Sequence, residues 1–214
     1  MNFLLQVTQH PGSIPRVTRR RRSNIQPVVL SQQHRDVGDD ERCMILEVAD
    51  ELVYEAGRTT LALALRGSRN QKLARYKVQD LPGFGMYRGM PEDEVLARVD
   101  QLVRDGILDI QASLDGFPLL AYTPHGLKLS ENLVAQRWLR QMREHLPDEK
   151  PFHPPFAYDL MPNRNTRTLN LVIDVVLTDA DEAWLPMLRS WSSGEVKKVR
   201  AKLAPLIERL EHGK

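Results

Sequence analysis

The residues best suited to chemistry lie in one short stretch, Leu65–Tyr76, which has the sequence LRGSRNQKLARY. It contains a hydroxyl group, two side-chain amides and four cations, the groups that bind phosphate oxygens. These residues are Arg66, Ser68, Arg69, Asn70, Gln71, Lys72 and Arg75. If Ser68 caps a helix here, free backbone N–H groups add to an anion site at the start of that helix.

The same region has a strong excess of positive charge. From Arg58 to Arg88 there are seven Lys or Arg residues, including Lys77 and Arg88, against the single acid Asp80. The whole chain has a formal charge of only +2, so the excess is local. A polyanion would be attracted to such a surface. The alternative is a solvated helical face that carries charge for solubility.

Motifs for nucleotide or metal chemistry are missing from the sequence. It has no GxxxxGKS-like loop and no GxGxxG after a predicted strand. Cys43 is the single cysteine, and the six histidines have no metal-binding spacing. We therefore expect a protein without metal or cofactor, and not an enzyme.

We also expect no membrane partner. No apolar run approaches the roughly 18 residues that a membrane span requires, and the first residues lack the pattern of a signal peptide. The sequence predicts a cytoplasmic protein, nucleoid-associated if the source is bacterial.

The composition of residues 1–40 predicts a basic N-terminal arm. Five arginines occur there among Pro, Ser, Gln and Asn without helical periodicity: Arg16, Arg19, Arg20, Arg21 and Arg22. Such blocks are commonly flexible and often bind nucleic acid. The alternative is a disordered tail with no partner.

Residues 41–146 predict one domain that is mostly helical. Helices are expected from Glu41 to Gly57, from a cap at Thr59 or Thr60 through Leu65, from Ser68 to about Tyr76, and from Pro91 to Gly106. A long helix is then expected from a cap at Thr123 to His145.

A β-hairpin is expected between the last two of these helices. Asp115-Gly116 would form its two-residue turn, flanked by Leu114 and Phe117, with Pro118 opposite Ser113. Helices followed by a two-stranded wing predict a winged-helix fold.

The remaining chain predicts a Pro-rich linker, 147–167, and a small α/β extension, 168–214. TLNLVIDVVL, residues 168–177, has the composition of a strand, and a helix with Trp184, Leu188 and Trp191 is expected after it. Ser192 and Glu195 would cap a last helix, kinked or split by Pro205. Its apolar stripe either packs internally or forms a dimer seam, so a homodimer through this helix is an open possibility. The expected fold class is α+β.

Four separated blocks resemble the RQC domain, the winged helix that follows the motor of RecQ-type DNA helicases. They are LRGSRNQKL, LPGFG, VDQLVRDGILDI and AYTPHGLKL, and the resemblance spans about residues 43–135. It implies that the helix at the RGS segment contacts DNA phosphates and that Phe117 presses on the end of a duplex. The helicase motor and the cysteine-rich zinc module are missing, so the chain resembles a free-standing RQC-type protein.

The expected function is therefore non-enzymatic binding of double-stranded DNA at ends, forks or junctions, in repair or recombination. An alternative is a dimeric winged-helix regulator that binds an operator, although acids crowd the helix that would enter the groove: Glu92, Asp93, Glu94, Asp100 and Asp105. A nuclease with Mg²⁺ at Asp174, Asp179, Asp181 and Glu182, and an adaptor that docks partners through Trp184 and Trp191, are weaker alternatives.

Overall fold

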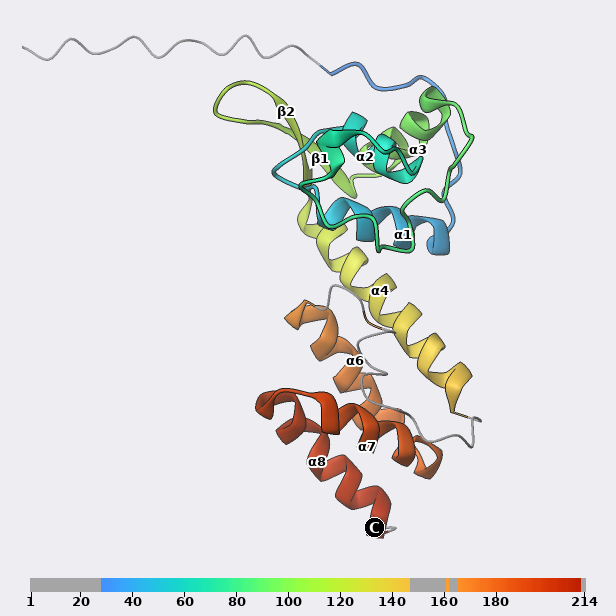
Figure 1. Ribbon diagram of the computed structural model, residues 1–214, viewed down its shortest axis with the longest axis vertical. Helices are drawn as coiled ribbons and strands as arrows, with labels where there is room; N and C mark the ends of the chain where they lie inside the picture. Colours follow the sequence, from blue (N-terminus) through green and yellow to red (C-terminus); the bar gives the residue numbers. More distant parts are fainter. Residues whose placement is uncertain (1–27, 147–160, 162–164, 213–214) are drawn as a thin grey trace, which may run out of the picture.

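The structure is a computed structural model that describes residues 28–146, 161 and 165–212 (Figure 1). The elements at one end of the molecule are α1 (Asp39–Asp50), α2 (Arg58–Leu65), the 3-10 turn η1 (Gln71–Leu73), α3 (Glu92–Arg104), β1 (Leu108–Ala112) and β2 (Pro118–Tyr122). The long helix α4 (Pro124–His145) leads to α6 (Thr166–Asp179), the 3-10 turn η2 (Glu182–Trp184), α7 (Leu185–Gly194) and α8 (Lys197–His212). The predicted winged-helix architecture, mostly helical with one antiparallel hairpin, is confirmed.

The helix predicted from Ser68 to Tyr76 is wrong. Only the single 3-10 turn η1 forms there, because the backbone after α2 packs closely against the loop of residues 81–89. Gly67 and Gly85 both have positive φ, and a Cβ on Gly67 would lie 2.9 Å from the Gly85 Cα. The Gly85 N–H donates to the carbonyl of Ala64 at 3.0 Å, which satisfies one end group of α2. Two glycines are required because any side chain would separate these backbones.

The hairpin forms with a register one residue away from the predicted one. Ala112 faces Pro118, and the Ser113 N–H donates to the Phe117 carbonyl at 2.8 Å. The loop therefore has three residues, 114–116, and Gly116 takes its left-handed position with φ 85°. Pro118 still falls at a position without a ladder hydrogen bond, as predicted, although its partner is Ala112 rather than Ser113.

The outer edge of β2 is paired by the connection between α1 and α2. The Tyr54 N–H donates to the Leu120 carbonyl at 2.7 Å, and the Leu120 N–H donates to the Ala56 carbonyl at 2.8 Å. The next residue, Gly57, lies so close that a Cβ would be 2.7 Å from the Pro118 carbonyl oxygen. These contacts attach the wing directly to the start of α2.

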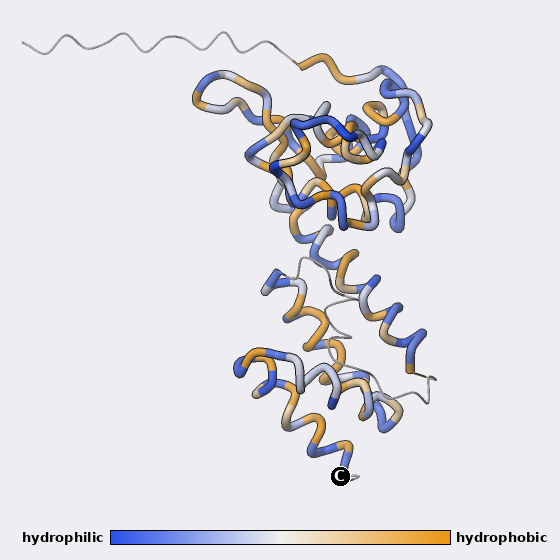
Figure 2. Tube along the Cα trace, in the orientation of Figure 1, coloured by the Kyte–Doolittle hydropathy of each residue, from blue (hydrophilic) through white to orange (hydrophobic). Residues whose placement is uncertain are grey.

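Helix α4 is shared by both ends of the molecule. The Thr123 hydroxyl accepts from the Gly126 N–H at 2.9 Å, which confirms the predicted cap. Trp138 and Met142 are buried, and Figure 2 shows hydrophobic and hydrophilic residues alternating along the helix. It packs on α1, where Arg137 pairs with the buried Glu47, and it also packs on α6. No helix in the described ranges is long and apolar enough to span a membrane.

The strand predicted at 168–177 is wrong: these residues belong to helix α6, so the described part of the extension is helical and not α/β. The Asn165 side chain caps the helix by accepting from the Thr168 N–H at 2.8 Å. The buried residues Thr168, Val172, Ile173 and Val176 share one helical face, against α4 and α8. Packing of that face outweighs the strand preference of its β-branched residues.

The last helices also differ from expectation at their ends. Ser192 lies inside α7, and the buried Glu195 accepts from the Trp191 indole N–H at 2.9 Å, so the predicted capping box does not form. Helix α8 continues through Pro205. Its stripe residues Val199, Leu203 and Leu206 are buried, and α8 packs on α6 and α7. The predicted linker falls mostly outside the described residues, and α6 begins within its last positions.

Candidate nucleic-acid interface

The predicted anion site at the RGS segment depends on side chains rather than on free backbone N–H groups. The Asn70 side chain accepts from the Lys72 N–H at 3.0 Å, and the Ser68 hydroxyl accepts from the Asn70 N–H at 3.2 Å. Both amides are therefore engaged within the segment itself. A single 3-10 turn also provides no appreciable dipole, so the expected helix N-terminus is corrected to a polar turn that displays cations.

Four cations at this turn and beside it are exposed: Arg69, Lys72, Lys77 and Arg88. Within the described ranges none of their charged groups forms a hydrogen bond or ion pair, so these charges are available to a partner. Arg75 is held differently, because its guanidinium lies 4.7 Å from the centre of the Tyr76 ring and donates to the Tyr76 hydroxyl. Gln71 is exposed on the same turn.

Arg88 lies close to the paired glycines. A Cβ built on Gly67 or on Gly85 would lie 3.4 and 3.5 Å, respectively, from its Nη2. The loop of residues 81–89 thus places the Arg88 charge beside the RGS segment, about 20 residues away in sequence.

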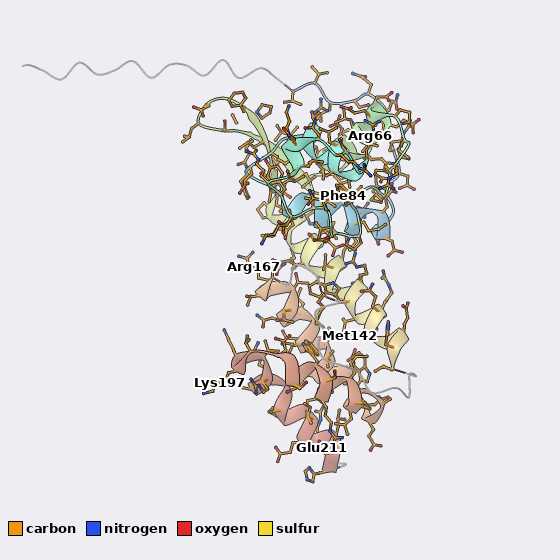
Figure 3. The ribbon with its side chains drawn as sticks, viewed as in Figure 1. Arg66, Phe84, Met142, Arg167, Lys197 and Glu211 are labelled. Atoms are coloured by element: carbon orange, nitrogen blue, oxygen red, sulfur yellow. The ribbon has the colours of Figure 1, made fainter. Side chains whose placement is uncertain are left out.

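The Arg66 side chain forms a hydrogen bond and an ion pair within the domain. Its Nε donates to the Met90 carbonyl at 3.0 Å, and its Nη1 lies 3.2 Å from the Glu92 carboxylate. The side chain is 33% exposed and lies at the winged-helix end, far from Lys197 and Glu211 (Figure 3). Because its hydrogen bonds link α2 to α3, Arg66 differs from its exposed neighbours, and phosphate contact by this residue stays a prediction.

The wing carries exposed apolar side chains at its tip. Phe117 is 67% exposed and Leu114 fully exposed, on a hairpin that projects from the rest of the molecule (Figure 1). The Phe117 N–H donates to the Ser113 hydroxyl at 3.0 Å, which fixes the backbone that carries the ring. An exposed aromatic ring on a braced turn can stack on a base without first leaving a core.

Two neighbouring hollows connect the wing tip with the cationic turn. One is lined by Phe117, by Arg58 and by Thr60 of α2, and the other by Thr60, Lys72 and Arg75. Thr60 lines both, so the two hollows adjoin. Phe117, Lys72 and Arg75 therefore border one connected surface, which the sequence alone could not establish.

The C-terminal half of helix α3, which has the position of a groove-reading helix, is hydrogen-bonded to residues 31–35 of the segment 28–37. The Ser31 N–H donates to the buried Asp100 carboxylate at 2.7 Å, and Arg104 donates to the carbonyls of Ser31 and Gln33 at 2.7 and 2.8 Å. The arm predicted over residues 1–40 thus ends in an ordered segment and in the first turn of α1, while its five arginines lie outside the described residues. A sequence signal existed: Asp100 interrupts an apolar stripe, and a buried carboxylate requires partners.

A family model described as the RQC domain matches residues 32–144, more than half of the chain. The chain belongs to the RQC domain family. The match begins inside the segment that is hydrogen-bonded to α3 and ends one residue before the end of α4, so both are part of the RQC domain here. No curated protein and no solved structure matches the chain.

Membership in the RQC domain family indicates the general function of this surface. The RQC domain is a winged helix that typically binds DNA, and the polar turn, the wing and the connecting hollows lie within the matched residues.

The acidic residues considered for Mg²⁺ do not form a site. Asp179 pairs with Arg143 at 3.7 Å, and the Asp181 carboxylate caps η2 by accepting from the Ala183 N–H at 3.1 Å. In the described ranges no group of three His, Cys, Asp or Glu side chains is placed to hold a metal ion. Trp184 and Trp191, considered as docking residues, are buried in the small core of α6–α8.

Proposed function

We propose that this RQC-domain protein is a non-enzymatic DNA-binding protein that recognises duplex ends, forks or junctions. The observation that carries the proposal is the connected surface that joins Phe117 to Lys72 and Arg75 through Thr60. One part suits the phosphate backbone and the other suits the face of a terminal base pair.

The cations would position the duplex without reading its sequence. Arg69, Lys72 and Lys77 are exposed cations on flexible stems, and contacts from such groups to phosphates carry little sequence information. Each phosphate neutralised releases counterions, which makes binding dependent on salt concentration. Arg88, above the paired glycines, would extend the same contact.

Phe117 would supply the preference for ends and forks. A ring at the wing tip can stack only where a base pair is exposed, and continuous duplex offers none. Stacking of a base on an aromatic side chain contributes roughly 1–3 kcal/mol, enough to discriminate between DNA structures.

The alternative of operator reading by α3 is disfavoured by the segment hydrogen-bonded to it and by charge. Residues 31–35 occupy the C-terminal half of the helix, and Glu92, Asp93 and Asp105 would approach phosphates if it entered a groove. The burial of Val199, Leu203 and Leu206 leaves the last helix with little apolar surface for a dimer seam. A role in repair or recombination, in the cytoplasm or on a bacterial nucleoid, accords with the proposed preference for DNA ends.

The proposal is tested by comparing forked DNA with the same duplex closed at both ends by hairpin loops. The wild-type protein should prefer the fork, and Phe117→Ala should lose most of that preference while keeping its affinity for closed duplex. Val196→Ala, which removes an exposed apolar side chain at the other end of the molecule, is the matched control. Equal wild-type affinity for both substrates would overturn the proposal.

A further inference from the structure

A groove of about 680 Å³ lies between the wing and the first turn of α2. Phe117 and Val29 border it, and they are 67% and 75% exposed. Gly57, Thr59 and Thr60 line it from the side of α2, and Asp115 is the acid that lines it at the wing tip. The proposed contact of Phe117 with a terminal base pair leaves this space unassigned.

Two of the most exposed apolar side chains line this groove. Among the described residues, the large hydrophobic side chains that are most exposed are Val29, Tyr54, Leu114, Phe117 and Val196. Val29 and Phe117 line the groove, Leu114 lies at the same wing tip, and Tyr54 lies on the connection that pairs with β2. Tyr54 also has a left-handed φ of 64°, an uncommon conformation for a residue with a bulky side chain. A cluster of exposed apolar groups of this kind marks a binding surface.

The lining chemistry matches a single nucleic acid strand. The apolar border offers faces on which bases can stack, and the Thr59 and Thr60 hydroxyls can donate hydrogen bonds to phosphate oxygens. Arg58 lines the groove but is engaged, because its guanidinium pairs with Asp100 and donates to the Val29 carbonyl at 2.8 Å. Pockets of roughly 300–1,000 Å³ hold small ligands, so the groove has room for a few unpaired nucleotides and not for a duplex.

The groove continues toward the cationic turn. Because Thr60 also lines the hollow formed by Lys72 and Arg75, a strand that passes Phe117 would run from the apolar border directly to positive charge. We infer that this groove binds the unpaired DNA strand that leaves the duplex at the wing tip, with bases against Phe117 and Val29 and the backbone along Thr59 and Thr60. The inference rests on the proposed function, since it assigns the path of a strand at a fork.

A charge placed at Thr59 tests the inference. Thr59 is exposed in the first turn of α2, where an acid is favoured by the helix dipole, so Thr59→Glu should fold at least as well as the wild type. Thr59→Gln is the matched neutral control. Thr59→Glu should bind a fork with unpaired arms about tenfold more weakly than the wild type, because the new carboxylate would repel a phosphate. Binding to the same duplex with blunt ends should change little, and Thr59→Gln should resemble the wild type on both substrates.

Photocrosslinking gives a second, independent measurement. A 5-iododeoxyuridine at the first unpaired position of each arm in turn should crosslink, for one arm, to the wing or to residues 57–60. Crosslinks from both arms that map only elsewhere, or equal effects of Thr59→Glu on forked and blunt DNA, would overturn the inference. A wild-type protein that binds blunt ends better than closed duplex, yet gains nothing from unpaired arms, would overturn the groove assignment alone. No preference for ends or forks at all would overturn the proposed function instead.

Discussion

Asp100 of α3 and Arg58 of α2 form an ion pair in which the carboxylate is fully buried. The same carboxylate accepts from the Ser31 N–H at 2.7 Å, and Arg58 donates to the Val29 carbonyl. One buried acid thus joins α3, the start of α2 and the segment 28–37, and this pair holds one border of the groove in place.

Asp100→Asn should destabilise the protein by about 1.5–3 kcal/mol, because it replaces charge-assisted hydrogen bonds with weaker neutral ones. Urea unfolding measures this change. Hydrogen exchange at the Ser31 amide should also accelerate. Asp105→Asn, at the exposed C-cap of the same helix, should stay within about 0.5 kcal/mol of the wild type. An unchanged unfolding midpoint in Asp100→Asn would contradict the prediction.

Lys72→Ala should weaken binding to every DNA sequence about equally and reduce the slope of log K against log salt by about 0.9, the contribution of one phosphate contact. Titrations at several salt concentrations measure this slope. Lys197→Ala provides the control, since Lys197 is exposed at the opposite end of the molecule (Figure 3).

Arg66→Ala should differ from Lys72→Ala in its main effect. Its side chain links the Met90 carbonyl and Glu92, so its loss should cost about 1–3 kcal/mol of stability. Thermal unfolding in the absence of DNA measures this cost. Wild-type stability together with a strongly reduced salt slope would instead identify Arg66 as a direct phosphate ligand.

Replacing Arg16 and Arg19–Arg22 together by Gln should reduce the salt slope by up to about 4.5, if each arginine contacts one phosphate. The preference for forks over closed duplex should be retained, because Phe117 is unchanged. Binding isotherms on both substrates separate the two effects. An unaltered slope would show that these arginines do not bind DNA.

Burial raises the pKa of the Cys43 thiol from 9.0 to about 12. At pH 8 the folded protein should react with thiol reagents at least about a hundredfold more slowly than the unfolded chain, because the thiolate is the reacting form. Below about pH 9 the thiol is neutral in both states. As the pH rises from about 9 to 12, only the unfolded chain loses the proton, so stability falls across that range. Reagent kinetics with and without urea test the first expectation.

Short-range patterns in the sequence were sufficient to predict helices α3 and α4 and the presence of the wing. The acids after Pro91, the Thr123 cap and the Asp115-Gly116 turn each act within a few residues, so their outcome depends little on the rest of the fold. The blocks that resemble the RQC domain likewise lie within the residues that the family model matches.

Residues 168–177 show where local patterns fail. Their β-branched composition favours a strand, yet the same residues also place Val172, Ile173 and Val176 on one helical face. The choice depends on the surface available for packing, and α4 and α8 provide a surface that fits a helix.

The sequence by itself determined the family, the helices with strong caps and the exposed cations, because these depend on residue types and on contacts a turn or two away. Only the tertiary structure decided the hairpin register, the engagement of Arg66, the hydrogen bonding of α3 to residues 31–35 and the connection of Phe117 to Lys72 through Thr60. Each of these depends on backbone hydrogen bonds, buried charge or shared surface between segments that are distant in the chain. The free energies of these contacts are determined only when the whole domain packs.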